Sequence, residues 1–264
     1  MKKLHVHILL FVFLLMLMNA CKKTDNFQSD QLADYFQLQV GKYITYRLDS
    51  LEFINFGTQD TIVSYLAKDV IDDSITDGLG RPSWRVIRYL SDTTGTQPWT
   101  PAEAYMVTVT RQDVEVVENN LRYIKLALPI VNGFSWLGNS YIDTRSLYSE
   151  YTYMDGWNYT YDSVGSPFNA FMGTIPNSIT IDQVDNTSNV GDSSFIERDY
   201  SVEVYAKGIG LIYKNYGKLD LTVDLRYAFF MPAATKKSAV IAAIYVKEGV
   251  LMGETGFVAV EEVL

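Results

Sequence analysis

The sequence predicts a mostly β protein with a single antiparallel β domain of about ten strands, folded as a curved sheet, a half-barrel or a sandwich. Apolar and polar residues alternate with a period of two in several segments, which is typical of half-buried strands. Clusters of Gly, Asn, Asp and Pro separate these segments and indicate turns. The chain shows no long stretch with a helical period and no internal repeat. Short strands joined by turns indicate an antiparallel arrangement.

The first half of the chain contains six strand candidates. In the first of them, within residues 35–50, Ile44, Tyr46 and Leu48 alternate with polar residues. The others cover residues 61–71, 83–90, 105–109, 114–117 and 121–128. Asn119 and Asn120 separate the last two, and asparagine tolerates the left-handed conformation of a tight turn. A β-hairpin is therefore predicted there.

The second half contains a second hairpin signal at Asp155-Gly156, a dipeptide that favours two-residue turns. Such a turn would make residues 149–162 two paired strands, with Met154 opposite Trp157. Residues 168–176 look irregular. Further strand candidates are residues 179–181, 200–206 and 219–227, the last being the most regular. Residues 238–246 are apolar and fit either a strand or a helix, because periodicity alone does not distinguish the two.

The N-terminus reads as a cleavable secretion signal. Lys2 and Lys3 precede an apolar run at residues 8–18, and Ala20 precedes Cys21. The apolar run is shorter than the roughly 20 residues that span a bilayer. The expected organisation is a signal peptide at residues 1–20, a lipidated tether at 21–34 and a β-rich domain at 35–264, whose composition changes after residue 232.

Met18-Asn19-Ala20-Cys21 resembles the lipobox of bacterial lipoproteins, although Met18 and Asn19 depart from its usual residues. The resemblance implies that Cys21 becomes the acylated first residue of the mature protein, and two or more acyl chains give a stable membrane anchor. Residues 38–43, 129–141 and 205–213 are similar to segments of uncharacterised, membrane-anchored lipoproteins of Bacteroidota-type bacteria. That similarity implies a β-rich lipoprotein of the cell envelope, at the outer membrane, and brings no activity with it.

Composition narrows the possible chemistry. His5 and His7 are the only histidines and Cys21 is the only cysteine. Without the leader, the chain has no histidine for a Ser-His-Asp triad, a Cys-His pair or a histidine-ligated zinc site, and no second cysteine for a disulfide. We expect no cofactor. The formal net charge of −9 makes nucleic acid a poor partner, because nucleic-acid binding depends on basic residues that neutralise phosphates.

Four aromatic residues are candidates for stacking on a ligand such as a sugar: Trp136, Tyr141, Trp157 and Tyr159. Flat rings with a polar edge suit that role, but cross-strand packing in a core uses the same residues. Gly208 and Gly210 begin like a nucleotide-binding motif, but Tyr213 replaces the third glycine, and a bend or bulge fits better.

Acidic residues are the remaining candidates for chemistry. A pair of carboxylates could hydrolyse a glycan, and the sequence offers Glu115, Glu118, Glu150 and Glu203 without a spacing that selects two of them. The acidic residues between 182 and 197 do not follow the order of a calcium loop, so no metal site is predicted.

These observations predict a non-enzymatic lipoprotein of the cell envelope with a binding or scaffolding role, anchored through acylated Cys21. The membrane would be contacted through the lipid, and a glycan or an envelope protein is the expected partner. Two alternatives stay open: a carboxylate-dependent glycan hydrolase, and a β cradle that carries an apolar ligand.

Overall fold

The computed structural model describes residues 30–54, 59–170, 173–188, 195–222 and 241–250. The predicted signal peptide and Cys21 lie outside these residues. The first half contains η1 (Leu32–Asp34), β1 (Lys42–Ile54), β2 (Gln59–Thr76), β3 (Pro82–Ser91), β4 (Thr100–Val109), β5 (Asp113–Glu118) and β6 (Leu121–Ala127). The second half contains β7 (Ser135–Trp136), η3 (Thr152–Met154), β8 (Tyr159–Ala170), β9 (Gly173–Ser188), β10 (Phe195–Ala206), β11 (Gly210–Thr222) and β12 (Ile241–Val250).

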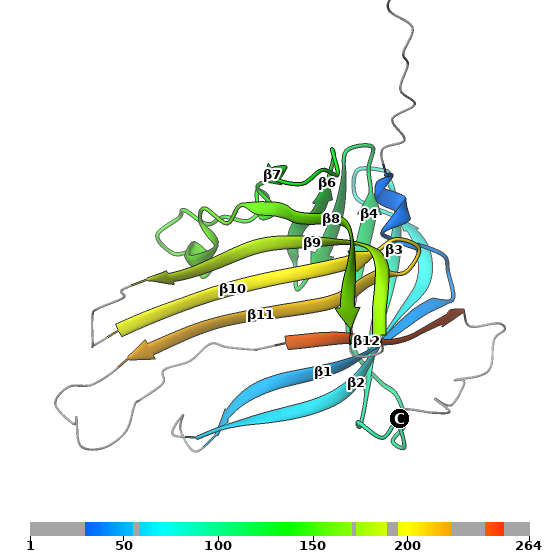
Figure 1. Cartoon of the computed structure of the whole chain (residues 1–264), viewed down its shortest axis with the longest axis horizontal. Coiled ribbons are helices and arrows are strands. Elements are labelled where there is room, and N and C mark those ends of the chain that lie inside the picture. The colour runs from blue at the N-terminus through cyan, green and yellow to red at the C-terminus, as the bar shows by residue number, and fades with distance from the viewer. Residues whose placement is uncertain (1–29, 55–58, 171–172, 189–194, 223–240, 251–264) are drawn as a thin grey trace, which may run out of the picture.

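Within the described residues, the twelve strands form one antiparallel sheet in the order β6-β5-β4-β3-β2-β1-β12-β11-β10-β9-β8-β7. Strands β1–β6 and β7–β11 are two meanders, in which each strand pairs with the next one in the chain. Strand β12 lies between β1 and β11 and joins the two meanders (Figure 1). The prediction of a mostly β, antiparallel, curved domain is confirmed. In the described part of the chain, no helix has the length and apolar character needed to cross a membrane.

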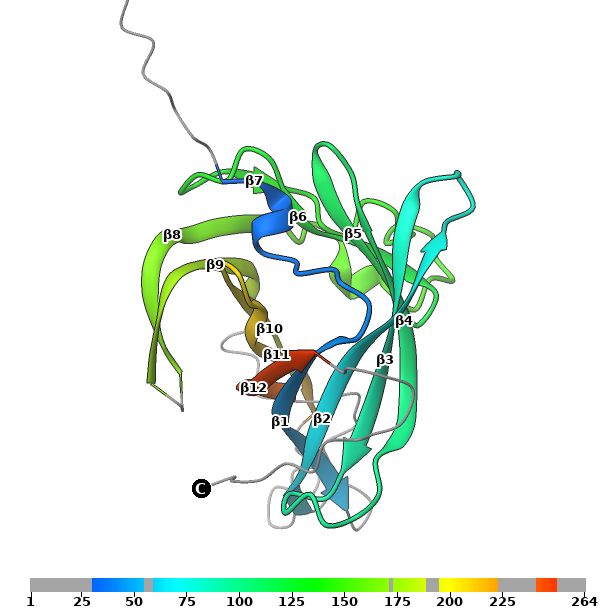
Figure 2. The same ribbon diagram turned by 90° about the vertical axis from the view of Figure 1, so that its right-hand side faces the viewer.

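The sheet curls until its two ends meet (Figure 2). The Ile124 backbone N–H of β6 donates to the Gly138 carbonyl, just after β7, at 2.6 Å. Trp136 Nε1 donates to the Ile124 carbonyl at 2.8 Å. A side chain at Gly138 would lie 2.2 Å from the Tyr159 ring, so only glycine allows this close approach. The edge groups of β6 are therefore partly satisfied by the opposite end of the same sheet.

The main core fills the concave side of the curl. Its fully buried members come from both meanders, and they include Val107, Val114, Leu126, Tyr159, Tyr161, Ile179 and Ile181. A second cluster joins Val204, Ala206 and Ile212. Val204 and Ala206 alternate along β10 with Tyr205, which belongs to the main core, so β10 is buried on both faces.

Residues 30–41 form a strap that crosses between β8–β10 and β2–β4 (Figure 2). Tyr35 is completely buried, and its hydroxyl donates to Asp30 Oδ2 at 2.6 Å. The Gly208 N–H donates to the Asp34 carbonyl at 2.7 Å, and Lys207 pairs with Asp30. The folded domain therefore begins by residue 30, five residues before the predicted boundary between tether and domain.

The predicted hairpin at Asn119-Asn120 is confirmed. The two residues have φ angles of 51° and 63°, and Glu118 pairs with Leu121 on either side of them. Positive φ at both central positions is the geometry of a type I′ turn, which matches the twist of the strands.

The predicted hairpin at Asp155-Gly156 is wrong. Asp155 has φ −65° and ψ 132°, Gly156 has φ 77°, and the Trp157 N–H donates to the Met154 carbonyl. This is a type II turn. It follows the short helix η3, and strand β8 begins only at Tyr159. Met154 and Trp157 are both buried, so core packing determines the backbone here.

The structure also tests three other predictions made from the sequence. Residues 168–170 and 173–176, expected to be irregular, are paired in strands β8 and β9, and Ala170 pairs with Gly173. Gly208 lies in the turn that joins β10 and β11, Gly210 opens β11, and the register of this pair shifts between Val204 and Tyr205, so the predicted bend or bulge is a hairpin turn with an irregularity beside it. Residues 241–250 form a strand, one of the two structures that the sequence allowed.

Candidate binding site inside the curled sheet

The concave side encloses a cavity of about 220 Å³. Its walls come from β1–β6, β10 and β11, and Phe36 and Leu38 of the strap border it. Most of the lining side chains are apolar or aromatic: Phe36, Leu38, Ile44, Tyr46, Leu48, Ala67, Ile71, Val86, Tyr105, Val107, Val116, Tyr205 and Leu211. An apolar cavity of about 150 Å³ binds benzene, so a space of this size admits a small organic ligand.

One wall of the cavity carries a row of charges across three strands. Asp69 of β2 lies opposite Arg88 of β3, which lies opposite Glu103 of β4. Arg88 Nε and Nη2 each donate to Asp69 at 2.7 Å, and the Tyr105 hydroxyl donates to the same carboxylate at 3.0 Å. This bidentate pair fixes the guanidinium in one plane.

Arg88 makes longer contacts with two further carboxylates. Its Nη1 lies 3.4 Å from Glu103 Oε2 and 3.7 Å from Glu118 Oε1. Burial is the largest single influence and lowers the pKa of Arg88, but the charge and hydrogen bonds of Asp69, with Tyr105 and Glu118, together outweigh it and raise that pKa well above its usual value. The guanidinium therefore stays protonated and holds three acids around it.

A second group of charges crosses the interior from β6 to β10. Lys125 Nζ donates to Glu203 Oε1 at 2.7 Å, and the Tyr205 hydroxyl donates to Glu203 Oε2 at 2.7 Å. Lys214 Nζ lies 3.6 Å from Glu203 Oε1. Burial raises the pKa of Glu203, but attraction to Lys125 and Lys214 is stronger and lowers it to about 2.

The two groups influence each other through Glu118. Burial raises the pKa of its carboxyl, but attraction to Lys214, Lys125 and Arg88 prevails and lowers it. Glu103 behaves in the opposite way, because burial and repulsion by Glu118 raise its pKa. Two neighbouring acids of the cavity are thus pushed in opposite directions.

The structure separates the four aromatic residues proposed for stacking. Trp157 and Tyr159 are only 5% and 1% exposed, so they belong to the core and are removed from the stacking prediction. Trp136 is half-buried and packs on Tyr161 at a centroid distance of 4.7 Å. Tyr141 is 59% exposed and lies 5.7 Å from the Arg122 guanidinium. The four rings do not form one exposed platform.

The four glutamates considered for catalysis are also separated. Glu118 and Glu203 line the cavity. Glu115 is buried without lining it, and Glu150 is exposed on a loop. The sequence interpretation missed six other charged residues of the cavity: Lys42, Asp69, Arg88, Glu103, Lys125 and Lys214. Each of these residues occupies an inward-facing position in a strand where apolar and polar residues alternate. That alternation is the signal in the sequence that could have identified them.

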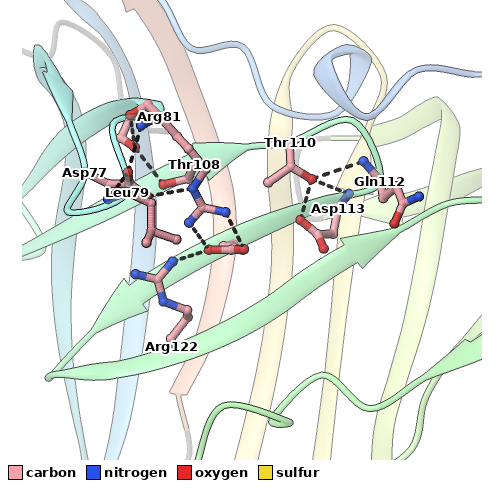
Figure 3. A network of polar contacts seen from close by, with 10 residues as sticks. Asp77, Leu79, Arg81, Thr108, Thr110, Gln112, Asp113 and Arg122 are labelled. Atoms are coloured by element: carbon pink, nitrogen blue, oxygen red, sulfur yellow. Dashed lines mark hydrogen bonds and ion pairs between the residues drawn. The ribbon is translucent and has the colours of Figure 1, made fainter.

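Arg81 and Arg122, which Figure 3 labels, belong to a separate polar network on β5 in which both bind Glu115. Arg81 donates to both of its oxygens, at 2.9 and 2.7 Å, and Arg122 donates to Oε2. Arg81 also donates to Asp77 at 2.7 Å. Val114 and Val116, the neighbours of Glu115 in β5, face the core, so Glu115 projects from the other face of the sheet.

No protein-family model matches the chain, and neither the curated proteins nor the solved structures contain a significant match to it. The functional argument therefore depends on the residues and on the geometry of the cavity.

Proposed function

We propose that this protein is a non-enzymatic binding protein of the cell envelope, anchored through acylated Cys21, that holds a small amphiphilic ligand inside its curled sheet. The observation that carries the proposal is the cavity of about 220 Å³, which combines an apolar lining with organised charges. A concave, mostly apolar space with a few convergent polar groups is typical of small-molecule sites. The proposal unites the predicted binding role with the β cradle that the sequence left open.

The charged groups favour binding over catalysis. Glu103 and Glu118 could serve as a general acid and a general base, since their pKa values are shifted in opposite directions. However, both contact the same guanidinium nitrogen of Arg88, which occupies the space where a scissile bond would have to lie. Hydrolysis of a glycan by the purified chain, abolished by Glu103→Gln or Glu118→Gln, would overturn the proposal.

Filling the cavity is expected to weaken ligand binding. Ala67 is 2% exposed and lines the cavity, so Ala67→Leu would add a larger apolar side chain within it. We expect this variant to bind 1-octanol at least about fivefold more weakly than the wild type, because the loss of even part of an apolar contact of this size costs about 1 kcal/mol. The measurement is isothermal titration of the full chain in lipid nanodiscs, with empty nanodiscs as the blank.

Ala104→Leu is the matched control, because Ala104 is exposed on β4 and does not line the cavity. It should bind 1-octanol as the wild type does, and thermal unfolding checks that both variants are folded. Equal affinities for the wild type and a folded Ala67→Leu variant, or no binding by the wild type, would contradict a ligand site in this cavity.

The anchor has its own test. Cys21→Ala is expected to release the chain from the membrane fraction, because no acyl chain can be attached without the thiol. Labelled palmitate should be incorporated into the wild type and not into the variant. A variant that stays membrane-bound, together with an unlabelled wild type, would show that Cys21 is not the anchor.

A further inference from the structure

We propose that the ligand is an amphiphile with a cationic amine head group, and that the Glu103 carboxylate receives this head group inside the cavity. The inference rests on the proposed function and names the chemical class of the ligand. The observation behind it concerns one carboxylate oxygen of Glu103. Oε1 of Glu103 is buried and has no hydrogen-bond partner among the described residues. Buried polar atoms are almost always paired, so an unpaired acceptor beside a cavity marks a position for a donor.

The strand register explains why Glu103 lacks a full partner. Arg88, its neighbour across β3 and β4, directs Nε and Nη2 to Asp69 in two bonds of 2.7 Å. Only Nη1 remains on the side of Glu103, and it reaches Oε2 at 3.4 Å. Glu103 therefore receives one long contact from Arg88 and no bidentate pair. Asp69 takes the strong pair, and Glu103 is left with an oxygen that no residue of the wall satisfies.

The formal charges of the cavity balance. Four acids line it, Asp69, Glu103, Glu118 and Glu203, and so do four bases, Arg88, Lys125, Lys214 and Lys42. Lys42 donates to the Gly208 carbonyl at 3.4 Å. The preference for a cation therefore depends on the acids that act on Glu103 itself.

Repulsion from the other acids acts directly on Glu103. After burial, Glu118 contributes most to raising its pKa, and Asp69 acts in the same direction. A bound ammonium group would offset this repulsion, because an opposite charge nearby stabilises the ionised carboxylate. An anionic head group placed there would add to the repulsion.

The lysines do not offer an equivalent site for an anion. Lys125 and Lys214 both face Glu203, at 2.7 and 3.6 Å. Their charges also lower the pKa of Glu118, so the pair is already engaged with two carboxylates. The uncharged lining of the cavity is mostly apolar or aromatic and includes Tyr46, Ala67 and Val107. A short alkyl chain with an amine at one end fits both parts of the space.

The test compares three probes of equal chain length: octylamine, 1-octanol and octanoate. Each is titrated calorimetrically into the full chain in lipid nanodiscs, with empty nanodiscs as the blank. We expect octylamine to bind about tenfold more tightly than 1-octanol, and octanoate to bind most weakly. Glu103→Gln should weaken octylamine binding about tenfold and change 1-octanol binding less than twofold, because a hydrogen bond to a charged group is lost only for the amine.

Glu150→Gln is the matched control. It makes the same chemical change and the same change in net charge at an exposed loop position that does not line the cavity. We expect it to change octylamine binding less than twofold. If 1-octanol or octanoate binds as tightly as octylamine, or if both glutamine variants weaken octylamine equally, the amine-specific role of Glu103 is wrong and the cavity remains a binding site. If none of the three probes binds, the proposed function itself fails.

Discussion

Replacing Lys125 by methionine is expected to lower the free energy of unfolding by about 3 kcal/mol at pH 7, because it leaves a buried carboxylate without its closest cation. Lys125 and Glu203 are 9% and 1% exposed in their side chains, and their charged atoms are 2.7 Å apart. In the variant, Glu203 would keep the Tyr205 hydroxyl and the more distant Lys214, at 3.6 Å. Methionine preserves most of the volume, so the change acts mainly on charge.

The difference in the free energy of unfolding between the wild type and Lys125→Met is expected to shrink as the pH falls. In the wild type the pKa of Glu203 is lowered to about 2, below its value in the unfolded chain. Its contribution to stability is therefore complete above the unfolded pKa of about 4.3 and is lost as the pH falls toward 2. Without Lys125 the pKa of Glu203 in the folded state rises, so protonation removes the penalty in the variant. Urea unfolding of the wild type and of Lys125→Met at pH 7, 5 and 3 measures how this difference narrows.

A double variant separates the ion pair from the packing. Lys125→Met combined with Glu203→Gln removes both charges, and we expect it to be more stable than Lys125→Met alone, since no buried charge is left uncompensated. A Lys125→Met variant that loses less than about 1 kcal/mol, with no dependence on pH, would show that the pair does not hold β6 against β10.

Strands with a clear alternation of apolar and polar residues were predictable because that signal is local. Ile44, Tyr46 and Leu48 alternate with polar residues, and β1 contains all of them. The Asn119-Asn120 hairpin was predictable for the same reason, because its turn geometry depends on two residues that tolerate positive φ. Alternation decides between strand and helix wherever one face of a strand is more apolar than the other.

The turn at Asp155-Gly156 shows where local signals fail. The dipeptide does make a turn, but Met154 and Trp157 beside it are buried in the core formed by distant strands. The same Gly156 conformation, with φ 77°, serves a type II turn as readily as a hairpin turn. Met154 and Trp157 decide between the two turn types because they pack against residues that are distant in the sequence. A short stretch of sequence does not show those contacts.

The interior charges were not predictable as a site. Asp69, Arg88 and Glu103 are adjacent because of the register of three strands, and they are 34 positions apart from first to last. In sequence each is an ordinary polar residue in an alternating segment. Lys125 and Glu203 meet only because the sheet curls, and that curvature has no signature in the alternation pattern. The sequence could supply the list of acids, but only the fold selects which of them share a cavity.

The Glu115 network gives the second large expected effect (Figure 3). Glu115→Gln is expected to lower the free energy of unfolding by about 3 kcal/mol at pH 7, since a buried carboxylate that pairs two arginines is lost. The side chain of Glu115 is 2% exposed, while Arg81 and Arg122 are each 28% exposed. Arg81 would keep Asp77, but Arg122 would keep only its contact with the Tyr141 ring among the interactions described above.

The pH dependence identifies the carboxylate as the cause. The hydrogen bonds from Arg81, followed by those from Arg122, hold the pKa of Glu115 below its ordinary value despite burial. A lowered folded pKa means that this stabilisation is present above the unfolded pKa of about 4.3 and fades as the pH falls through the folded value. The stability of the wild type should therefore move toward that of Glu115→Gln as the pH falls below the unfolded pKa of about 4.3.

Glu150→Gln makes the same substitution at an exposed loop position and serves as the control, with an expected change within about 0.5 kcal/mol. Arg122→Met removes one of the two cations and leaves the bidentate Arg81 pair, so its cost should lie between those of the two glutamine variants. Urea unfolding between pH 3 and pH 7 measures all three. If Glu115→Gln and Glu150→Gln gave equal stabilities at pH 7, Glu115 would not hold the loop of Asp77 and Arg81 against β5 and β6.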